Sequence, residues 1–150
     1  MAKQLLEVHC SNICRDPDGP NSEVTLRELA KKHPSVVTLV QLDVADQCSI
    51  KESAKKVGSL LGKNGLNLLV NNAAMLTQKN MMTATVEDMQ NAFNTNVIGP
   101  LFVIREYLPY RRTAAKAKGR PGMSCNKAAV INTSTDSASM SIMPVMNEPF

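Results

Sequence analysis

The feature that most constrains the fold is the stretch 66–74, which reads Leu-Asn-Leu-Leu-Val-Asn-Asn-Ala-Ala. Its first five residues are mostly branched aliphatic, the pattern of a short strand buried on both faces of a parallel sheet. Asn71 and Asn72 then end the apolar run, so polar side chains stand where the strand stops. Nucleotides and substrates bind outside the carboxyl ends of the strands in such sheets. The stretch therefore predicts one wall of a binding site, with an ordinary asparagine turn as the alternative.

Three further segments are predicted to be strands. Residues 35–42 form the clearest β-branched run, residues 128–133 form a second aliphatic run, and residues 8–14 form a run with weaker alternation. A turn-rich loop, Asp-Pro-Asp-Gly-Pro at 16–20, follows the last of these. Polar residues stand directly after the runs: Arg15, Asp43, Ser134 and Thr135.

Helical patterns alternate with these strands. They cover residues 22–33, 46–62 and 101–116, and a further helix begins at Thr85, which has Asp88 three residues on as a variant capping box. The opening residues 2–7 resemble the last turns of another helix. We expect inward-facing residues on two of the helices: Ile50, Ala54, Val57 and Leu61 on the second, and Met89, Ala92 and Phe93 on the one that begins at Thr85.

Composition favours one globular domain and excludes several classes of protein. The chain has 150 residues, 43% of them hydrophobic and 20% charged, and no apolar run long enough to span a membrane. Its net charge of +4 comes largely from residues 111–127, and aromatic residues make up only 3%, so no stacking platform for nucleic acid is expected. The charged start of the sequence lacks a signal-peptide core, which favours a cytoplasmic location.

The cysteines give no evidence of a metal site or of a disulfide framework. The four are scattered, and the closest pair, Cys10 and Cys14, has neither a second pair nor nearby histidines to complete a zinc site. We therefore expect free thiols and no metal.

The Asn-Asn-Ala-Ala sequence at 71–74 resembles the Asn-Asn-Ala-Gly signature of the short-chain dehydrogenases/reductases, with Ala74 in place of the usual glycine. Asn-Val-Ile-Gly at 96–99 also matches the family. Cys-Arg-Asp-Pro at 14–17 is similar to its C-factor-like and sniffer-like carbonyl reductase branch. The resemblance implies an α/β fold, an incomplete Rossmann-like doubly wound parallel sheet within residues 1–135. These residues would supply its second to fifth strands, without the first strand or those after the fifth.

The resemblance also implies a cofactor, NADP or NADPH. An arginine at the position of Arg15 commonly pairs with the 2′-phosphate, a role that suits a planar guanidinium. The family uses the aspartate and its successor, here Asp43 and Val44, to contact the adenine ring. Asn71 and Ala73 would line the same cofactor site. The alternatives are a surface arginine without a ligand and an aspartate that merely caps a loop.

Three residues match catalytic positions, and the substrate implied is a small-molecule carbonyl compound. Asn96 matches the asparagine that helps to hold a water next to the family's active-site lysine. Ser134 or Thr135 would provide the hydroxyl that donates to the carbonyl oxygen. The alternatives are helix-break chemistry before Pro100 for the asparagine and ordinary strand-end polar groups for the hydroxyls.

Two patterns imitate functional motifs without the right context. The glycines between residues 58 and 65 mimic a phosphate loop, but they close a helix and precede a strand, the reverse of a true fingerprint. Tyr107 and Arg111 mimic the catalytic Tyr-x-x-x-Lys. They stand before the fifth strand, and arginine does not readily supply the tuned chemistry of lysine.

Two motifs of the family do not occur in the 150 residues: the glycine-rich turn after the first strand, and Tyr-x-x-x-Lys. Without them we expect no amide cradle for the pyrophosphate and no general acid, and therefore an inactive chain. A missing central strand would leave two strand edges facing a vacant slot, which predicts marginal stability or aggregation.

We expect residues 136–150 to form a divergent tail that is a candidate for disorder. The alternative function is a non-catalytic interaction protein, or a fragment that pairs with a full-length relative through the helix at 101–116 as a homodimer or heterodimer.

Overall fold

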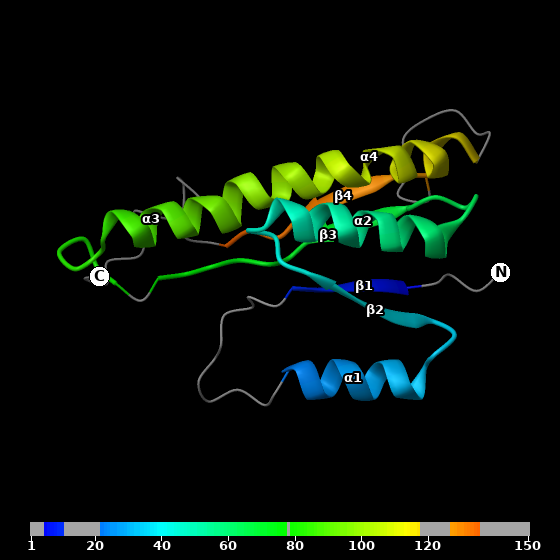
Figure 1. Cartoon of the computed structure of the whole chain (residues 1–150), viewed down its shortest axis with the longest axis horizontal. Coiled ribbons are helices and arrows are strands. Elements are labelled where there is room, and N and C mark those ends of the chain that lie inside the picture. The colour runs from blue at the N-terminus through cyan, green and yellow to red at the C-terminus, as the bar shows by residue number, and fades with distance from the viewer. Residues whose placement is uncertain (1–4, 11–21, 78, 118–126, 136–150) are drawn as a thin grey trace.

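The computed structural model describes residues 5–10, 22–77, 79–117 and 127–135, and helices alternate with strands along this part of the chain. The predicted tail at 136–150 lies outside the described residues. The elements are β1 (Leu5–Cys10), α1 (Ser22–Lys32), β2 (Val37–Leu42), α2 (Gln47–Leu61), β3 (Leu68–Asn71), α3 (Val86–Phe93), η1 (Asn94–Ile98), α4 (Gly99–Ala117) and β4 (Ala129–Asn132). Figure 1 shows α3, the π-helical turn η1 and α4 following one another as a single long helical run, with α2 beside α4 and α1 next to β2.

The four strands form two separate parallel pairs. β1 pairs with β2, and β3 pairs with β4, while no ladder joins the two pairs within the described residues. All four strands run in the same direction across the molecule (Figure 1). The split into two pairs is what the expected loss of a central strand predicts, and the α/β class with an incomplete Rossmann-like sheet is confirmed.

The prediction of a helix over residues 2–7 is wrong at residues 5–7, because Leu5–Cys10 is strand β1, while residues 2–4 lie outside the described part of the chain. Each of its six residues has a partner on β2, from Leu5 opposite Val37 to Cys10 opposite Leu42. Pairing with a β-branched neighbour thus outweighs a short and weak helical pattern, since local propensity is easily overridden by tertiary context.

Helix α2 begins and packs as its sequence predicts. The carboxylate of Asp46 caps the helix by accepting a hydrogen bond from the backbone N–H of Cys48 at 2.8 Å. Gly62 ends it with a φ of +54°, a conformation that glycine adopts without steric cost. The four residues expected to face inward are all buried and lie in the hydrophobic core with residues of β2, β3 and α4: Ile50, Ala54, Val57 and Leu61.

The contact between α2 and α4 explains both imitations of functional motifs. Tyr107 is 1% exposed, and its hydroxyl donates to Ser53 Oγ at 3.0 Å, so it is a core residue. Burial raises its pKa. Gly58 gives room for the ring of Tyr110, and Gly65 gives room for the backbone of α4 next to Ala114. These glycines therefore serve helix packing and do not form a phosphate loop.

Two predictions of buried faces are wrong. Met89 and Phe93 of α3 are 62% and 57% exposed, because the contacts of α3 with other elements are mainly with η1, which follows it in the chain. Leu68 and Val70 of β3 are about half exposed, whereas Leu69 between them is buried. Within the described part of the chain, only one face of β3 is covered.

Candidate functional site

The ends of the strands carry the predicted polar residues at one edge of the molecule. Asp43 directly follows β2, and Asn71 is the last residue of β3. Ser134 and Thr135 are exposed and come shortly after β4. Because the four strands run in the same direction, these carboxyl ends point the same way (Figure 1). Arg15 lies outside the described residues.

A hydrogen bond between two asparagines joins the ends of β3 and β4. Asn71 Nδ2 donates to Asn132 Oδ1 at 2.8 Å, and the N–H of Thr133 donates to the carbonyl of Asn71 at 2.9 Å. Sequence reasoning did not identify Asn132 as part of the site. The available signal was that both apolar runs contain an asparagine where they end, and the two are direct partners in the strand register.

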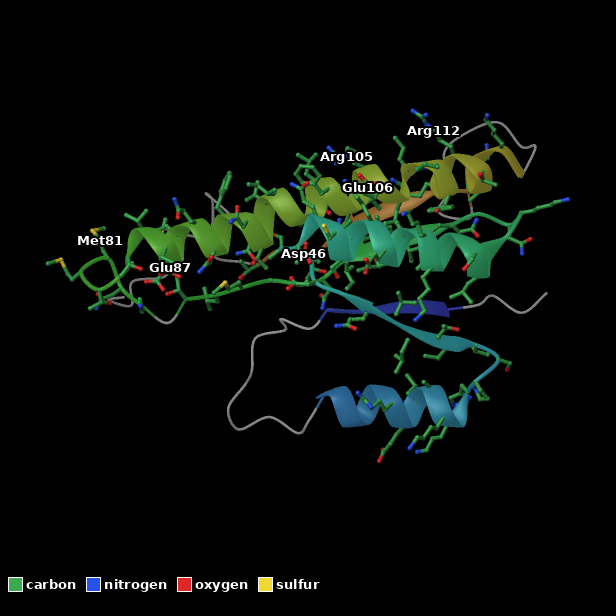
Figure 2. All side chains as sticks on the ribbon, viewed as in Figure 1. Asp46, Met81, Glu87, Arg105, Glu106 and Arg112 are labelled. Atoms are coloured by element: carbon green, nitrogen blue, oxygen red, sulfur yellow. The ribbon has the colours of Figure 1, made fainter. Side chains whose placement is uncertain are left out.

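The segment after β2 is held by its own side chains and by α2. The backbone N–H of Asp43 donates to Ser49 Oγ at 2.8 Å, while Asp43 Oδ1 accepts from the N–H of Ala45 at 2.9 Å. Val44 is 7% exposed and packs in the core. A ligand at this point would therefore meet the Val44 backbone and not its side chain. Figure 2 shows Asp46, the cap of α2, at the next turn of the chain.

The side chain of Asn96 makes two hydrogen bonds to the backbone of Met75, in the segment that follows β3. Its Oδ1 accepts from the N–H of Met75 at 2.7 Å, and its Nδ2 donates to the carbonyl of Met75 at 2.8 Å. Ala73, two residues earlier, is partly buried against the core. The structure thus brings Asn96 to the Asn71–Met75 segment. Met75 itself was not predicted from the sequence to be part of the site. Nothing in the local sequence indicates this contact, which spans 21 residues.

The described residues contain no group of three or more His, Cys, Asp or Glu side chains that could hold a metal ion. Cys48 is a free, exposed cysteine. In the described part of the chain, none of the helices combines the length and apolar character needed to cross a membrane. The polar groups at the strand ends are thus amides, hydroxyls, backbone groups and one carboxylate.

A family model described as enoyl-(acyl carrier protein) reductase matches residues 1–147. Together with the parallel strands and the asparagines at their ends, this match defines the class: the chain belongs to the short-chain dehydrogenase/reductase family of oxidoreductases.

Solved carbonyl reductases are among the similar structures. The NADPH-bound carbonyl reductase from chicken fatty liver is 37% identical, with a TM-score of 0.79, covering 94% of this chain and 50% of that one. This likeness agrees with the predicted carbonyl reductase branch. The carbonyl reductase Sniffer of Drosophila melanogaster has a TM-score of 0.78 at 22% identity, over 93% of this chain and 53% of that one, and shows the shared fold.

Curated relatives are longer than this chain. An uncharacterized oxidoreductase of Schizosaccharomyces pombe is 29% identical over 110 residues, which are 73% of this chain and 42% of that protein. The 150 residues thus span about half, or less, of the proteins that they match.

Proposed function

We propose that these residues bind NADP or NADPH along the carboxyl ends of the strands and contribute to carbonyl reduction by hydride transfer. The observation that carries the proposal is the shared edge: Asp43, Asn71 and Asn132 stand at the ends of parallel strands that run the same way. The chicken relative, which is NADPH-bound, has the same fold at 37% identity. A small-molecule carbonyl compound would be the substrate.

The residues fit the two ends of the dinucleotide better than its middle. In our proposal, Asp43 and the Val44 backbone meet the adenine, while Asn71 and Ala73 line the nicotinamide side. Arg15 is proposed for the 2′-phosphate. The glycine-rich turn that would cradle the pyrophosphate does not occur in the sequence. Binding by these residues alone is therefore expected to be weak.

The catalytic roles remain part of the proposal. Ser134 or Thr135 would donate to the carbonyl oxygen of the substrate, because both are exposed after the end of β4. Asn96 uses its side chain on Met75, so a role in holding water would rely on its backbone carbonyl. When bound, the cofactor would supply the hydride. No Tyr-x-x-x-Lys occurs to exchange the proton, so we propose that these 150 residues alone do not turn over.

Calorimetry with NADP tests the binding. We expect Asp43→Ala to weaken NADP binding about tenfold, the cost of losing a charge-assisted hydrogen bond. The matched control is Glu87→Ala, which removes an exposed carboxylate at the start of α3 (Figure 2). No heat from the unchanged protein at millimolar NADP would refute the proposal.

A second assay tests turnover. Purified protein is mixed with NADPH and an aromatic aldehyde or a quinone, and the nicotinamide absorbance is followed. We expect no loss of absorbance above the control without protein. Clear consumption of NADPH would contradict the proposed inactivity and would leave the binding proposal standing.

Exposed apolar residues favour pairing with a full-length relative as a second candidate function. The exposed residues of α4 after Leu101 are mostly polar or charged, and Figure 2 shows two of them, Arg105 and Arg112. The apolar exposure lies instead on α3, η1 and the start of α4. We propose that the pairing surface is shifted toward α3 from the predicted 101–116. Its residues are Val86, Met89, Phe93, Val97 and Leu101, each at least 50% exposed.

Co-purification with a complete relative tests this candidate. Phe93→Asp should abolish capture of the relative, because it places a charge in the apolar surface. Arg112→Glu changes charge elsewhere on α4 and should leave capture intact. Elution as a strict monomer with no captured relative would contradict the candidate.

The cytoplasmic location stays a prediction.

A further inference from the structure

The turn between α3 and α4 contacts both halves of the divided sheet. Its residues Asn94–Ile98 form a π-helix, and Gly99 follows as its cap. Such turns insert an extra residue into a helix and often occur at functional sites. Asn96 lies within the π-helix, and the N–H of Gly99 closes it by donating to the carbonyl of Asn94. Asn96 touches the segment after β3, and Gly99 touches the segment after β2.

The contact with the β2 side depends on the absence of a side chain at Gly99. A Cβ at this position would lie 2.6 Å from the carbonyl oxygen of Val44 and 3.2 Å from its carbonyl carbon. Both are backbone atoms, so they cannot move aside as a flexible side chain would. Val44 is also fixed from its other side, because it is buried in the core and follows Asp43, whose N–H donates to Ser49.

On the β3 side, the turn contacts the chain through two hydrogen bonds between the Asn96 side chain and the Met75 backbone. The amide group both donates to and accepts from the same backbone residue, at 2.8 Å and 2.7 Å. A bidentate contact of this kind fixes the position of the Met75 backbone relative to the turn. The two strand pairs share no ladder in the described residues, so no strand-to-strand hydrogen bond sets this spacing.

We propose that Asn96 and Gly99 are positioning residues. Together they set the distance between two pieces of backbone, the one at Val44 after β2 (the Val44 segment) and the one at Met75 after β3 (the Met75 segment). This inference rests on the proposed function, because that distance matters when one ligand must reach both segments. A dinucleotide gains affinity from its two halves only if the two subsites are correctly spaced. The turn would therefore determine how well NADP binds, without contacting it.

A measurement without nucleotide tests the coupling directly. Gly99→Ala changes the β2 contact, and amide exchange measured by NMR reports on the hydrogen bond of the Met75 N–H to Asn96. If one turn holds both segments, this variant should speed exchange at Met75 by at least about tenfold, as expected for a local opening. The matched control is Gln90→Ala, which changes an exposed side chain of α3 about one helical turn before the π-helix. Unchanged exchange at Met75 in Gly99→Ala would overturn the proposal.

A binding measurement separates spacing from damage to one subsite. Adenosine 2′,5′-bisphosphate would occupy the adenine side alone, whereas NADP would reach both segments. We expect Gly99→Ala and Asn96→Ala to weaken NADP at least about fivefold more than the bisphosphate, because only the linked ligand depends on the spacing. Equal losses for both ligands would overturn the proposal.

One further variant, Asn96→Asp, keeps the outcomes distinct. Asn96→Asp keeps an acceptor for the N–H of Met75 but loses the donor. Its affinity for NADP should therefore fall between those of the unchanged protein and Asn96→Ala. It also provides a second variant if Gly99→Ala does not fold. If the unchanged protein does not bind NADP, the proposed function fails, and exchange at Met75 still decides whether the turn couples the two segments.

Discussion

The α2–α4 contact and helix α3 differ in how completely their side chains are covered. Between α2 and α4, Tyr107 is 1% exposed, its hydroxyl is paired with Ser53, and glycines allow close approach. Helix α3, in contrast, has no buried residue. Both the helices of the α2–α4 contact and helix α3 have amphipathic sequences. An apolar stripe in a sequence therefore predicts a helix, but it does not predict that other described residues bury that stripe.

The largest expected effect is at Tyr107. Tyr107→Ala should destabilise the protein by about 3–5 kcal/mol, the range for removing a buried aromatic side chain and leaving a cavity. Urea denaturation would measure this loss, which is large enough to unfold a marginally stable domain. Tyr107→Phe keeps the ring and should cost only about 0.5–1.5 kcal/mol, the net value of one hydrogen bond. Equal effects of the two variants would show that ring packing does not hold α2 against α4.

Two glycines at the end of α2 provide the next test. Gly62 and Gly65 both have positive φ, 54° and 72°, but only Gly65 is crowded. A Cβ at Gly65 would clash with the backbone nitrogen of Ala114, whereas one at Gly62 would meet nothing within 4 Å. Gly65→Ala should therefore cost about 1–3 kcal/mol more than Gly62→Ala, as overpacking does. Similar urea midpoints would show that backbone conformation, and not crowding, decides both.

The same contrast explains what the sequence could predict. Strands β2, β3 and β4 and their polar ends could be recognised because each of these apolar runs stops at a polar residue, as at Asn71. Helix α2 was predictable because its apolar period and its cap, Asp46, are local signals. The exposure of Phe93 and the strand at Leu5–Cys10 depend on what lies opposite them in space. For the same reason, the contacts of Asn96 with Met75 and of Gly99 with Val44 could not be predicted.

A smaller effect is expected from pH at the start of α3. Asp88 accepts hydrogen bonds from the hydroxyl of Thr85 at 2.6 Å and from Lys79 Nζ at 2.9 Å. These contacts, with the Thr85 hydroxyl first, lower the pKa of Asp88 from 3.8 to about 2. A lowered pKa means that the carboxylate stabilises the folded state above pH 3.8, and that this stabilisation is lost as pH falls toward 2.

The difference in stability between the unchanged protein and Asp88→Asn should therefore shrink as pH falls from about 4 to about 2. Urea denaturation at several pH values measures it. Glu87→Gln is the control, because it removes a charge from the same turn without touching the contacts of Asp88. A difference that stays constant over this range would mean that Asp88 acts through shape and not through charge.

The smallest effect is expected where the side chain is large but uncovered. Phe93→Ala should change the free energy of unfolding by no more than about 0.5 kcal/mol, as at other exposed positions, because Phe93 is 57% exposed. Val103→Ala, farther along the same helical run, removes fewer atoms but should cost at least about 1 kcal/mol, because Val103 is 2% exposed and its loss leaves a cavity. Paired urea titrations at low protein concentration compare the two. If Phe93→Ala costs more, α3 must be covered in solution by a second copy or another partner, and the contrast with the α2–α4 contact would no longer hold.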